Sequence, residues 1–382
     1  MKILQRYFFS QILKSVVFVL VAFLGLFAFF DLISELSSVG RGGYQLQHVF
    51  IYILLGFPGY IYELMPFAVL IGTIYAMAMF ASNSEFTIMR VSSLSTRDAC
   101  GILAKIGLIF LVFTFVVGEV ITPITARVAN DFRNAMLGRT ASDVFKTGMW
   151  SKDTIRKNGL DGQVIGSRFM NVKTMRPDGT LENIRLYEFN DRLELVKTVS
   201  AENASYLGNH QWQLNRVVES HLETPEREKG KRFPDSAPSL KTKKFDSVTM
   251  TSDITPDILS VISVDANKMS AYELAVYNQH LVENKQDATS YQMAFWKKII
   301  YPFSVFVMMA LALPFAYLHF RSGGVSLKIF SGIMIGVAFI LINNLFSHVG
   351  LLNTWPAFLT AIIPSALFLL SAVIALWWVE RH

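Results

Sequence analysis

Residues 16–30 read VVFVLVAFLGLFAFF, an uninterrupted run with no charged side chain. Five further predominantly apolar runs follow it, and each is long enough to cross a bilayer core, which takes about 20 helical residues. The six runs cover residues 12–34, 54–80, 101–125, 297–318, 325–347 and 356–379. The sequence therefore predicts an α-helical integral membrane protein with six transmembrane helices.

The overall composition agrees with a membrane protein. Of the 382 residues, 52% are hydrophobic and only 17% are charged, whereas soluble domains carry about 25% charged residues. The net charge of +6 is modest and unevenly distributed, so it does not indicate a nucleic-acid partner. Cys100 is the only cysteine, which excludes a disulfide within the chain.

The first run follows a basic start, as a secretory signal does, but no small-residue cleavage site comes after it. We expect a retained anchor. Lys and Arg in short connections mark the cytoplasmic side. One side holds Lys2, Arg6, Lys14, Arg90, Arg97, Arg321, Lys328 and Arg381, and the opposite short connections hold only Arg41. This asymmetry predicts an inner-membrane protein with both termini cytoplasmic and residues 126–296 outside that membrane.

The long segment between the third and fourth runs has a different pattern. From Gln163 onward apolar and polar residues alternate, for example over 184–189, with turn residues between the alternating stretches. This period predicts antiparallel strands, including strands near 204–207, 212–222 and 247–250. A sheet domain of this size favours a sandwich or jelly roll, and the strand order stays open.

Two further features of this segment can be predicted. Residues 224–245 are rich in Lys, Arg and Pro, which is typical of a mobile basic loop. Ser270 and Glu273 have the spacing of a capping box and predict a helix over 271–283. The expected organisation is transmembrane helices 1–3 in residues 1–125, a periplasmic jelly-roll-like β domain in residues 126–296, and transmembrane helices 4–6 in residues 297–382.

The sequence contains no motif of an active site. It has no phosphate-binding G-x-x-x-x-G-K-[ST] loop, no H-E-x-x-H and no G-x-S-x-G, and its seven histidines lack the spacing of metal ligands. We therefore expect a protein that is not itself an enzyme, with neither catalytic nor metal-binding residues.

The connection between the second and third runs is a candidate docking site. Over about residues 82–95, Phe86, Met89 and Arg90 fall on one helical face with Glu85 beside them, and Ser84 is placed to cap the helix. Such a short amphipathic helix fits a groove on a partner. The alternative is a surface helix that only joins two spans.

Three other residues are candidates for contacts with a lipid. Arg127 and Arg133 follow the third run on the outer side and suit an anionic headgroup, although each alone also reads as surface charge. Trp212 in the sheet is a candidate for the lipid path, with the hydrophobic core as the alternative.

Glu63 and Glu119 lie near outer helix ends, where interfacial solvation or a lining role would explain them.

Taken over the whole chain, the arrangement resembles the lipopolysaccharide export permeases of the LptF/LptG family, and it looks more like the LptG branch. The more specific stretches are Met65-Pro66, Ser84-Glu85 with Met89, Gly118-Glu119 with Pro123, Gly148 to Asp153, and Tyr291, Trp296, Lys298 and Tyr301-Pro302. One departure is the stretch 25–30, which has no lysine where the LptG pattern carries one.

The resemblance implies a permease subunit of an ABC-type complex that extracts lipopolysaccharide from the inner membrane and passes it to a periplasmic bridge. The implied partners are a homologous LptF-like permease, an LptB-like cytoplasmic ATPase dimer and a single-span LptC-like bridge protein. ATP and Mg would be bound by the ATPase, with no cofactor in this chain, and Glu85 with its neighbours would form the coupling helix.

Three rival functions have distinguishable features. A mechanotransmitting protein of the ABC class has four spans per chain rather than six. An ion-coupled transporter needs broken helices or charge pairs near the midplane. A scaffold whose external domain only binds partners would carry no glycolipid.

Overall fold

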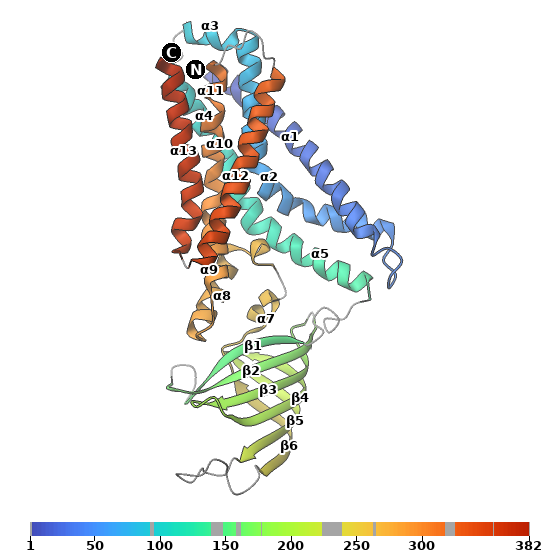
Figure 1. Ribbon diagram of the computed structural model, residues 1–382. Helices are drawn as coiled ribbons and strands as arrows, with labels where there is room; N and C mark the ends of the chain where they lie inside the picture. The colour runs from blue at the N-terminus through green and yellow to red at the C-terminus, as the bar shows by residue number, and fades with distance from the viewer. Residues whose placement is uncertain are drawn as a thin grey trace. The chain divides into compact units, whose positions relative to one another are not determined.

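The computed structural model describes residues 2–91, 95–138, 148–157, 162–176, 178–223, 239–262, 265–317, 325–353 and 355–381. The chain forms two compact units (Figure 1). The helical unit comprises residues 1–133, 266–275 and 288–382, and the sheet unit comprises residues 134–265 and 276–287. Each unit is described separately below.

Six helical segments of the described chain are long and apolar enough to span a membrane, which confirms the prediction of six transmembrane helices. The first half contains α1 (Lys2–Leu36), α2 (Leu46–Ser82), the short α3 (Glu85–Val91) and α4 (Thr96–Val116). The π-helical turn η1 (Val117–Ile121) joins α4 to α5 (Thr122–Met136), so one continuous segment covers 97–136.

In the second half of the helical unit, the fourth span is divided into short helices and the last two spans are continuous. The fourth span is divided into α9 (Thr289–Ile300), η3 (Tyr301–Phe303), α10 (Ser304–Ala312) and α11 (Pro314–Tyr317), and α12 (Val325–Leu352) and α13 (Ala357–Arg381) follow it. Pro302 lies in η3 and Pro314 begins α11. A proline lacks the N–H that continues a helix, which explains these divisions.

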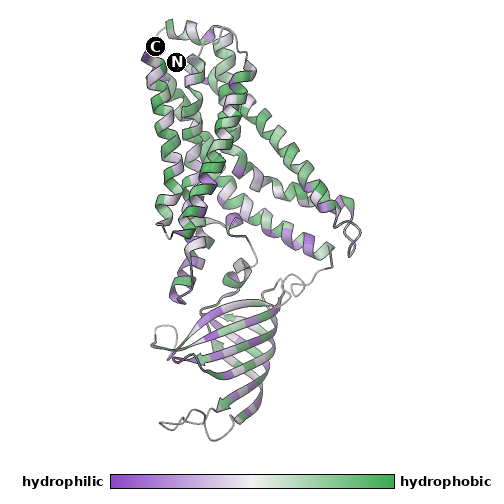
Figure 2. Cartoon of the chain, in the orientation of Figure 1, coloured by the Kyte–Doolittle hydropathy of each residue, from purple (hydrophilic) through white to green (hydrophobic). Residues whose placement is uncertain are grey.

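Helix α2 is the centre of the helical unit. Of the most apolar 18-residue stretch of α2, 89% is buried within the chain. The corresponding share is 11% for α1, 17% for α12 and 22% for α13. Helix α1 packs along α2, and Figure 2 shows apolar residues along nearly the whole length of both. Buried Phe8, Ile12 and Val16 of α1 share one core with Met65, Met77 and Phe80 of α2.

A glycine permits this close packing. A Cβ added at Gly72 would lie 2.7 Å from the backbone nitrogen of Val16, so the two backbones approach more closely than any larger residue allows. Membrane helices associate through such small residues, because no hydrophobic effect drives them together within lipid. Gly72 therefore sets the contact between α1 and α2.

The sheet unit contains six antiparallel strands in sequential order, from β1 at one edge to β6 at the other. They are β1 (Met149–Arg156), β2 (Val164–Met175), β3 (Leu181–Asn190), β4 (Leu195–Gly208), β5 (Gln211–Glu223) and β6 (Ser239–Thr251). The predicted all-β insertion between two sets of helices is confirmed. Among the described strands it forms one curled sheet rather than two stacked sheets (Figure 1).

One face of the sheet carries the core, as the period-2 alternation predicted. Met170, Val172, Ile184, Leu186 and Leu214 are each no more than 2% exposed. Ile258 and Leu259 of the short helix α7 (Pro256–Ile262) join the same core. The chain's own side chains therefore fill one end of the concave face.

The prediction of a basic loop over 224–245 was wrong for its second half. Residues 239–245 belong to β6 and pair with β5, with Lys243 opposite Glu219, and residues 224–238 lie outside the described residues. Lysines are characteristic of edge strands, where their charge opposes pairing with another chain. The lysine-rich composition concealed the strand.

The helix that leads back to the membrane was predicted correctly. Helix α8 spans Ala271–Glu283, and both bonds of its capping box are present. The Ser270 backbone N–H donates to Glu273 Oε2 at 2.8 Å, and the Glu273 N–H donates to Ser270 Oγ at 3.2 Å. A 3₁₀ turn, η2 (Ala266–Lys268), precedes it.

We predict that Gly72→Leu lowers the thermal stability of the detergent-solubilised chain, because the new side chain would meet the Val16 backbone. Such overpacking costs about 1–3 kcal/mol. Gly25→Leu is the matched control, since nothing lies within 4 Å of a Cβ at that position of α1. Equal melting temperatures for the two variants would contradict this account of the α1–α2 contact.

Candidate functional site

The predicted docking segment folds as α3, a helix of seven residues. Glu85 in its first turn accepts hydrogen bonds from the Tyr7 hydroxyl at 2.9 Å and from the Asn83 amide at 3.1 Å. Ser84 has φ +61°, and its backbone carbonyl accepts the Ile88 N–H at 3.0 Å, so it begins the helix through its main chain. These contacts fix α3 to the ends of α1 and α2.

The predicted docking face of α3 was partly wrong. Phe86 is 2% exposed and packs edge-on against Tyr317 with the ring centroids 5.0 Å apart, and Met89 packs against the same core. Ile88 and Val91 are instead 63% and 86% exposed. Position 90 is helical, but its side chain, like residues 92–94, lies outside what the structure describes.

Arg127 and Arg133 both lie on α5, and both have carboxylate partners within the chain. Arg133 binds Glu35 of α1 through two nitrogens, each 3.1 Å from a carboxylate oxygen. Arg127 forms an ion pair with Glu273 of α8. A headgroup would have to displace a carboxylate from each arginine, and the headgroup contact stays a prediction.

The acidic residues near the outer helix ends have structural partners. Glu119 Oε2 accepts the Ala271 N–H at 2.9 Å, and the Tyr301 hydroxyl donates to the backbone carbonyl of Glu63 at 2.5 Å. Glu63 also lines a cavity of about 230 Å³ between α1, α2 and α5. Its position supports the lining role.

Residues that carried the family resemblance meet around Tyr62. A Cβ on Gly118, within the π-helical turn, would lie 2.4 Å from the Tyr62 ring. The Lys298 ammonium lies 4.6 Å from the centre of the same ring and is almost completely buried. A cation over an aromatic face is stabilised by the ring quadrupole, so the glycine, the tyrosine and the lysine form one packing unit.

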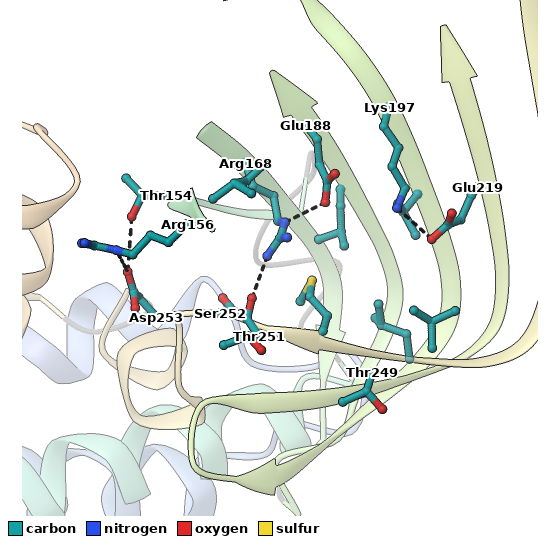
Figure 3. A pocket seen from close by; sticks show the side chains of 16 residues that line it. Thr154, Arg156, Arg168, Glu188, Lys197, Glu219, Thr249, Thr251, Ser252 and Asp253 are labelled. Carbon is teal, nitrogen blue, oxygen red and sulfur yellow. Dashed lines mark hydrogen bonds and ion pairs between the residues drawn. The ribbon is translucent and has the colours of Figure 1, made fainter. Parts of the chain in front are cut away.

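The sheet unit contains a cavity of about 250 Å³, and its wall includes core residues such as Leu186 and Leu214 (Figure 3). Arg168 of β2 is at its centre and donates to Glu188 of β3 at 3.0 Å, to Asp153 of β1 at 3.3 Å and to the Thr251 carbonyl at 3.0 Å. Farther along the wall, Lys197 and Glu219 form an ion pair at 2.8 Å.

The same cavity wall also contains apolar side chains, those of Leu186, Val199, Leu214, Val248 and Met250. The interior of this cavity is therefore amphipathic. Paired charges and aliphatic side chains lie next to each other along the strands, as Leu186 and Glu188 do on β3.

Burial affects two carboxylates differently: that of Asp153, which binds Arg168, and that of Glu219, which lines the cavity. Burial raises the pKa of Asp153, although the Ser252 hydroxyl, 2.6 Å away, and Arg168 oppose this shift. Burial also acts to raise the pKa of Glu219, but the hydrogen bond and charge of Lys197 outweigh it, and the resulting pKa is lowered. Glu219 is thus held as a carboxylate by its lysine.

Trp212 is a core residue, so its assignment to a lipid path was wrong. The side chain is fully buried in the sheet core, and its indole N–H donates to the Ile254 carbonyl at 2.8 Å. The sequence analysis did not predict the residues that line the nearby cavity. Alternation shows which face of a strand is buried, but it does not show where along that face the packing stops and a cavity begins.

Comparison with known proteins identifies the family. The family model described as lipopolysaccharide export system permease LptF/LptG matches residues 6–378. The chain belongs to the LptF/LptG family. It is 31% identical over 377 residues to the lipopolysaccharide export system permease protein LptG of Haemophilus influenzae, covering 98% of this chain and 97% of that protein. It is 28% identical over 381 residues to LptG of Escherichia coli K12, covering 99% and 98%.

These relatives confirm the resemblance to LptG along nearly the full length. As a member of the LptF/LptG family, the chain is a transport permease of lipopolysaccharide export and a multi-pass membrane protein. The permease thus combines six spanning helices with an inserted sheet.

We predict that protonation of His280 weakens the sheet unit below about pH 6.5, the usual histidine pKa. Burial lowers the pKa of His280 in the folded chain, against the opposing charges of Asp253 and Glu283. Below that pH the unfolded chain takes up a proton that the folded chain does not, so stability is full above it and falls as the pH decreases.

The measurement is amide hydrogen exchange of the sheet strands in the full-length permease at pH 7.5 and 5.5, after correction for intrinsic rates. We expect less protection at pH 5.5 in the natural protein and a smaller difference in His280→Gln. The same pH dependence in both proteins would refute the assignment to His280.

Proposed function

We propose that this chain is one permease of an export complex, paired with a homologous permease and driven by a separate cytoplasmic ATPase dimer. It would extract lipopolysaccharide from the inner membrane and pass it to a single-span periplasmic bridge protein. In this proposal both termini are cytoplasmic, the sheet unit is periplasmic, and ATP and Mg are bound by the ATPase.

The observation that carries the proposal is the exposure of α1. Only 11% of its most apolar stretch is buried within the chain, and Phe18 and Val21 are 75% and 61% exposed. Together with family membership, this supports a surface that meets acyl chains or the apolar face of a second permease. A scaffold that only displays an external domain would not need such an exposed apolar helix.

The energetics of the lipid support a continuous apolar route. Exposing each methylene to water costs about 0.8 kcal/mol, so the several dozen methylenes of a multi-acylated lipid would cost tens of kcal/mol. Nucleotide hydrolysis cannot supply that in one step. The complex must therefore keep the acyl chains covered and use ATP to change conformation.

The cytoplasmic coupling element in this proposal is α3. Its Glu85 is fixed by Tyr7 and Asn83, its Phe86 is anchored in the helical core, and its Ile88 and Val91 face outward. A helix anchored on one face and apolar on the other suits a hydrophobic groove on a partner. The exposed pair therefore replaces Phe86 and Met89 as the proposed docking residues, and Phe86 positions the helix.

We predict that Val91→Asp reduces both co-purification of the ATPase and ATP-driven transfer of lipopolysaccharide from proteoliposomes to the soluble domain of the bridge protein. Burying an unpaired carboxylate in the docking groove would lower affinity at least about tenfold. The control is Val39→Asp, an exposed valine in the connection between α1 and α2. Unchanged assembly and transfer in Val91→Asp would exclude this docking surface, and absence of transfer by the natural complex would exclude the proposed function.

We also predict that Glu85→Arg uncouples ATP hydrolysis from lipid release, because it removes the acceptor for Tyr7 and Asn83 and reverses the charge at the start of α3. Tyr7→Phe is the control that removes only one of these hydrogen bonds. We expect a substantially larger loss of release per ATP hydrolysed in Glu85→Arg. An equal loss in both variants would show that the internal contact, and not docking, sets the coupling.

A further inference from the structure

The cavity between α1, α2 and α5 contains groups that the structure leaves available for a ligand. Its volume is about 230 Å³, the space of several water-sized groups at about 30 Å³ each. Its lining includes Asp31 and Glu35 of α1, Tyr52, Tyr60 and Glu63 of α2, and Thr122 of α5. A short charged group fits this space, but a whole sugar headgroup does not.

Asp31 differs from Glu35 in its partners. Glu35 is neutralised by the two-point contact with Arg133. Asp31 receives only the Tyr60 hydroxyl, 2.9 Å from Oδ1 and 2.8 Å from Oδ2, and no cationic side chain in the described part of the chain lies within 4 Å of it. An ionised carboxylate accepts about four hydrogen bonds, so Asp31 retains accepting capacity.

A second observation points to a ligand in the same cavity. The Thr122 side chain is 4% exposed, and its hydroxyl has no hydrogen-bond partner among the residues that the structure describes. Buried hydroxyls normally form a hydrogen bond, because a buried hydroxyl without one costs about 1–3 kcal/mol of stability. Thr122 is one of the residues that line the cavity, so its unpaired hydroxyl is the second polar group that we assign to an occupant.

The charged residues that line the cavity determine whether it favours a cation or an anion. Three lining residues are acidic, Asp31, Glu35 and Glu63, and Lys268 at the exposed rim is the basic one. With Glu35 paired to Arg133, Asp31 is a carboxylate of the cavity that no cationic side chain among the described residues contacts. Tyrosine faces add a further attraction for cations, so the cavity favours a cation over a phosphate.

The surroundings of Asp31 point to a lipid as the source of that cation. On α1, Phe29, Phe30 and Ile33 are 56%, 57% and 51% exposed. On α2, Phe50 and Leu54 beside Tyr52 are 53% and 61% exposed. The helices that form the polar cavity thus carry uncovered apolar side chains on their other faces, an arrangement that matches an amphiphile with a charged head and apolar chains.

We propose that this cavity receives a primary ammonium group on the headgroup of the transported glycolipid, with Asp31 as its counterion and Tyr60 and Thr122 as its polar neighbours. The inference rests on the proposed function and names the substrate form that this permease prefers. An amine attached to a lipid phosphate is short enough to enter, while the rest of the headgroup stays outside.

The test uses the full complex in proteoliposomes that contain equal amounts of two lipopolysaccharides, with and without phosphoethanolamine on the lipid A phosphates. Mass spectrometry measures the ratio of the two forms released with ATP. We expect the natural permease to favour the amine-bearing form by about fivefold to tenfold, the range of one partly buried ion pair. Asp31→Asn should bring the ratio close to one, and Thr122→Val should lower it.

Asp131→Asn is the matched control, because it makes the same change at an exposed position of α5 outside the cavity, and it should keep the natural ratio. Equal release of both forms by the natural permease would overturn the inference and leave the proposed function intact. Absence of release of either form would overturn both. Persistence of the preference in Asp31→Asn would also overturn the inference.

Two further arms identify the source of the cation. Chelation of calcium with EGTA, which leaves the Mg that the ATPase needs, should leave the preference unchanged, and loss of the preference would assign the cavity to a calcium ion instead. Soluble phosphoethanolamine at the concentration of the lipid should not compete. Competition by the soluble amine would overturn the assignment to a lipid-borne group.

Discussion

The helical unit depends on the contact between α1 and α2. Inside a bilayer, helices gain little by leaving lipid for one another, so their association rests on close packing. Gly72 lets the α2 backbone approach that of α1 at Val16, and this contact leaves the other side of α1 uncovered. The apolar side chains of α1 that support contact with lipid are therefore exposed because α1 packs on α2 through only one of its sides.

Ion pairs and hydrogen bonds determine the outer ends of these helices. Arg133 joins α5 to α1, Arg127 joins α5 to α8, and Glu119 caps the first N–H of α8. Each arginine that looked available for a phosphate has a carboxylate from another helix. The positive charges thus serve the fold, and the cavity between the helices is left with an excess of acidic groups.

Much of the architecture could be predicted from the sequence because it depends on local patterns. Hydropathy identified the six spans, alternation identified the sheet, and the Ser270–Glu273 spacing located α8 at its observed bounds. Phe86 and Trp212 were misplaced because periodicity shows that residues share a face but not what covers that face. The partners of Arg127 and Arg133 are distant in sequence, by 98 residues for Glu35 and Arg133, and no local pattern reports such pairs.

The π-helical turn at Val117–Ile121 has a consequence for everything after it. A π-helical turn contains one residue more than an α-helical turn, and one residue corresponds to about 100° of rotation around a helix. The polar side of α5 is therefore turned by roughly that angle from the direction in which an unbroken α4 would have pointed it. Thr122 and Arg133 meet their neighbours on α1 and α2 only in this rotated setting, so a single inserted residue decides which side of a 40-residue segment forms the cavity wall.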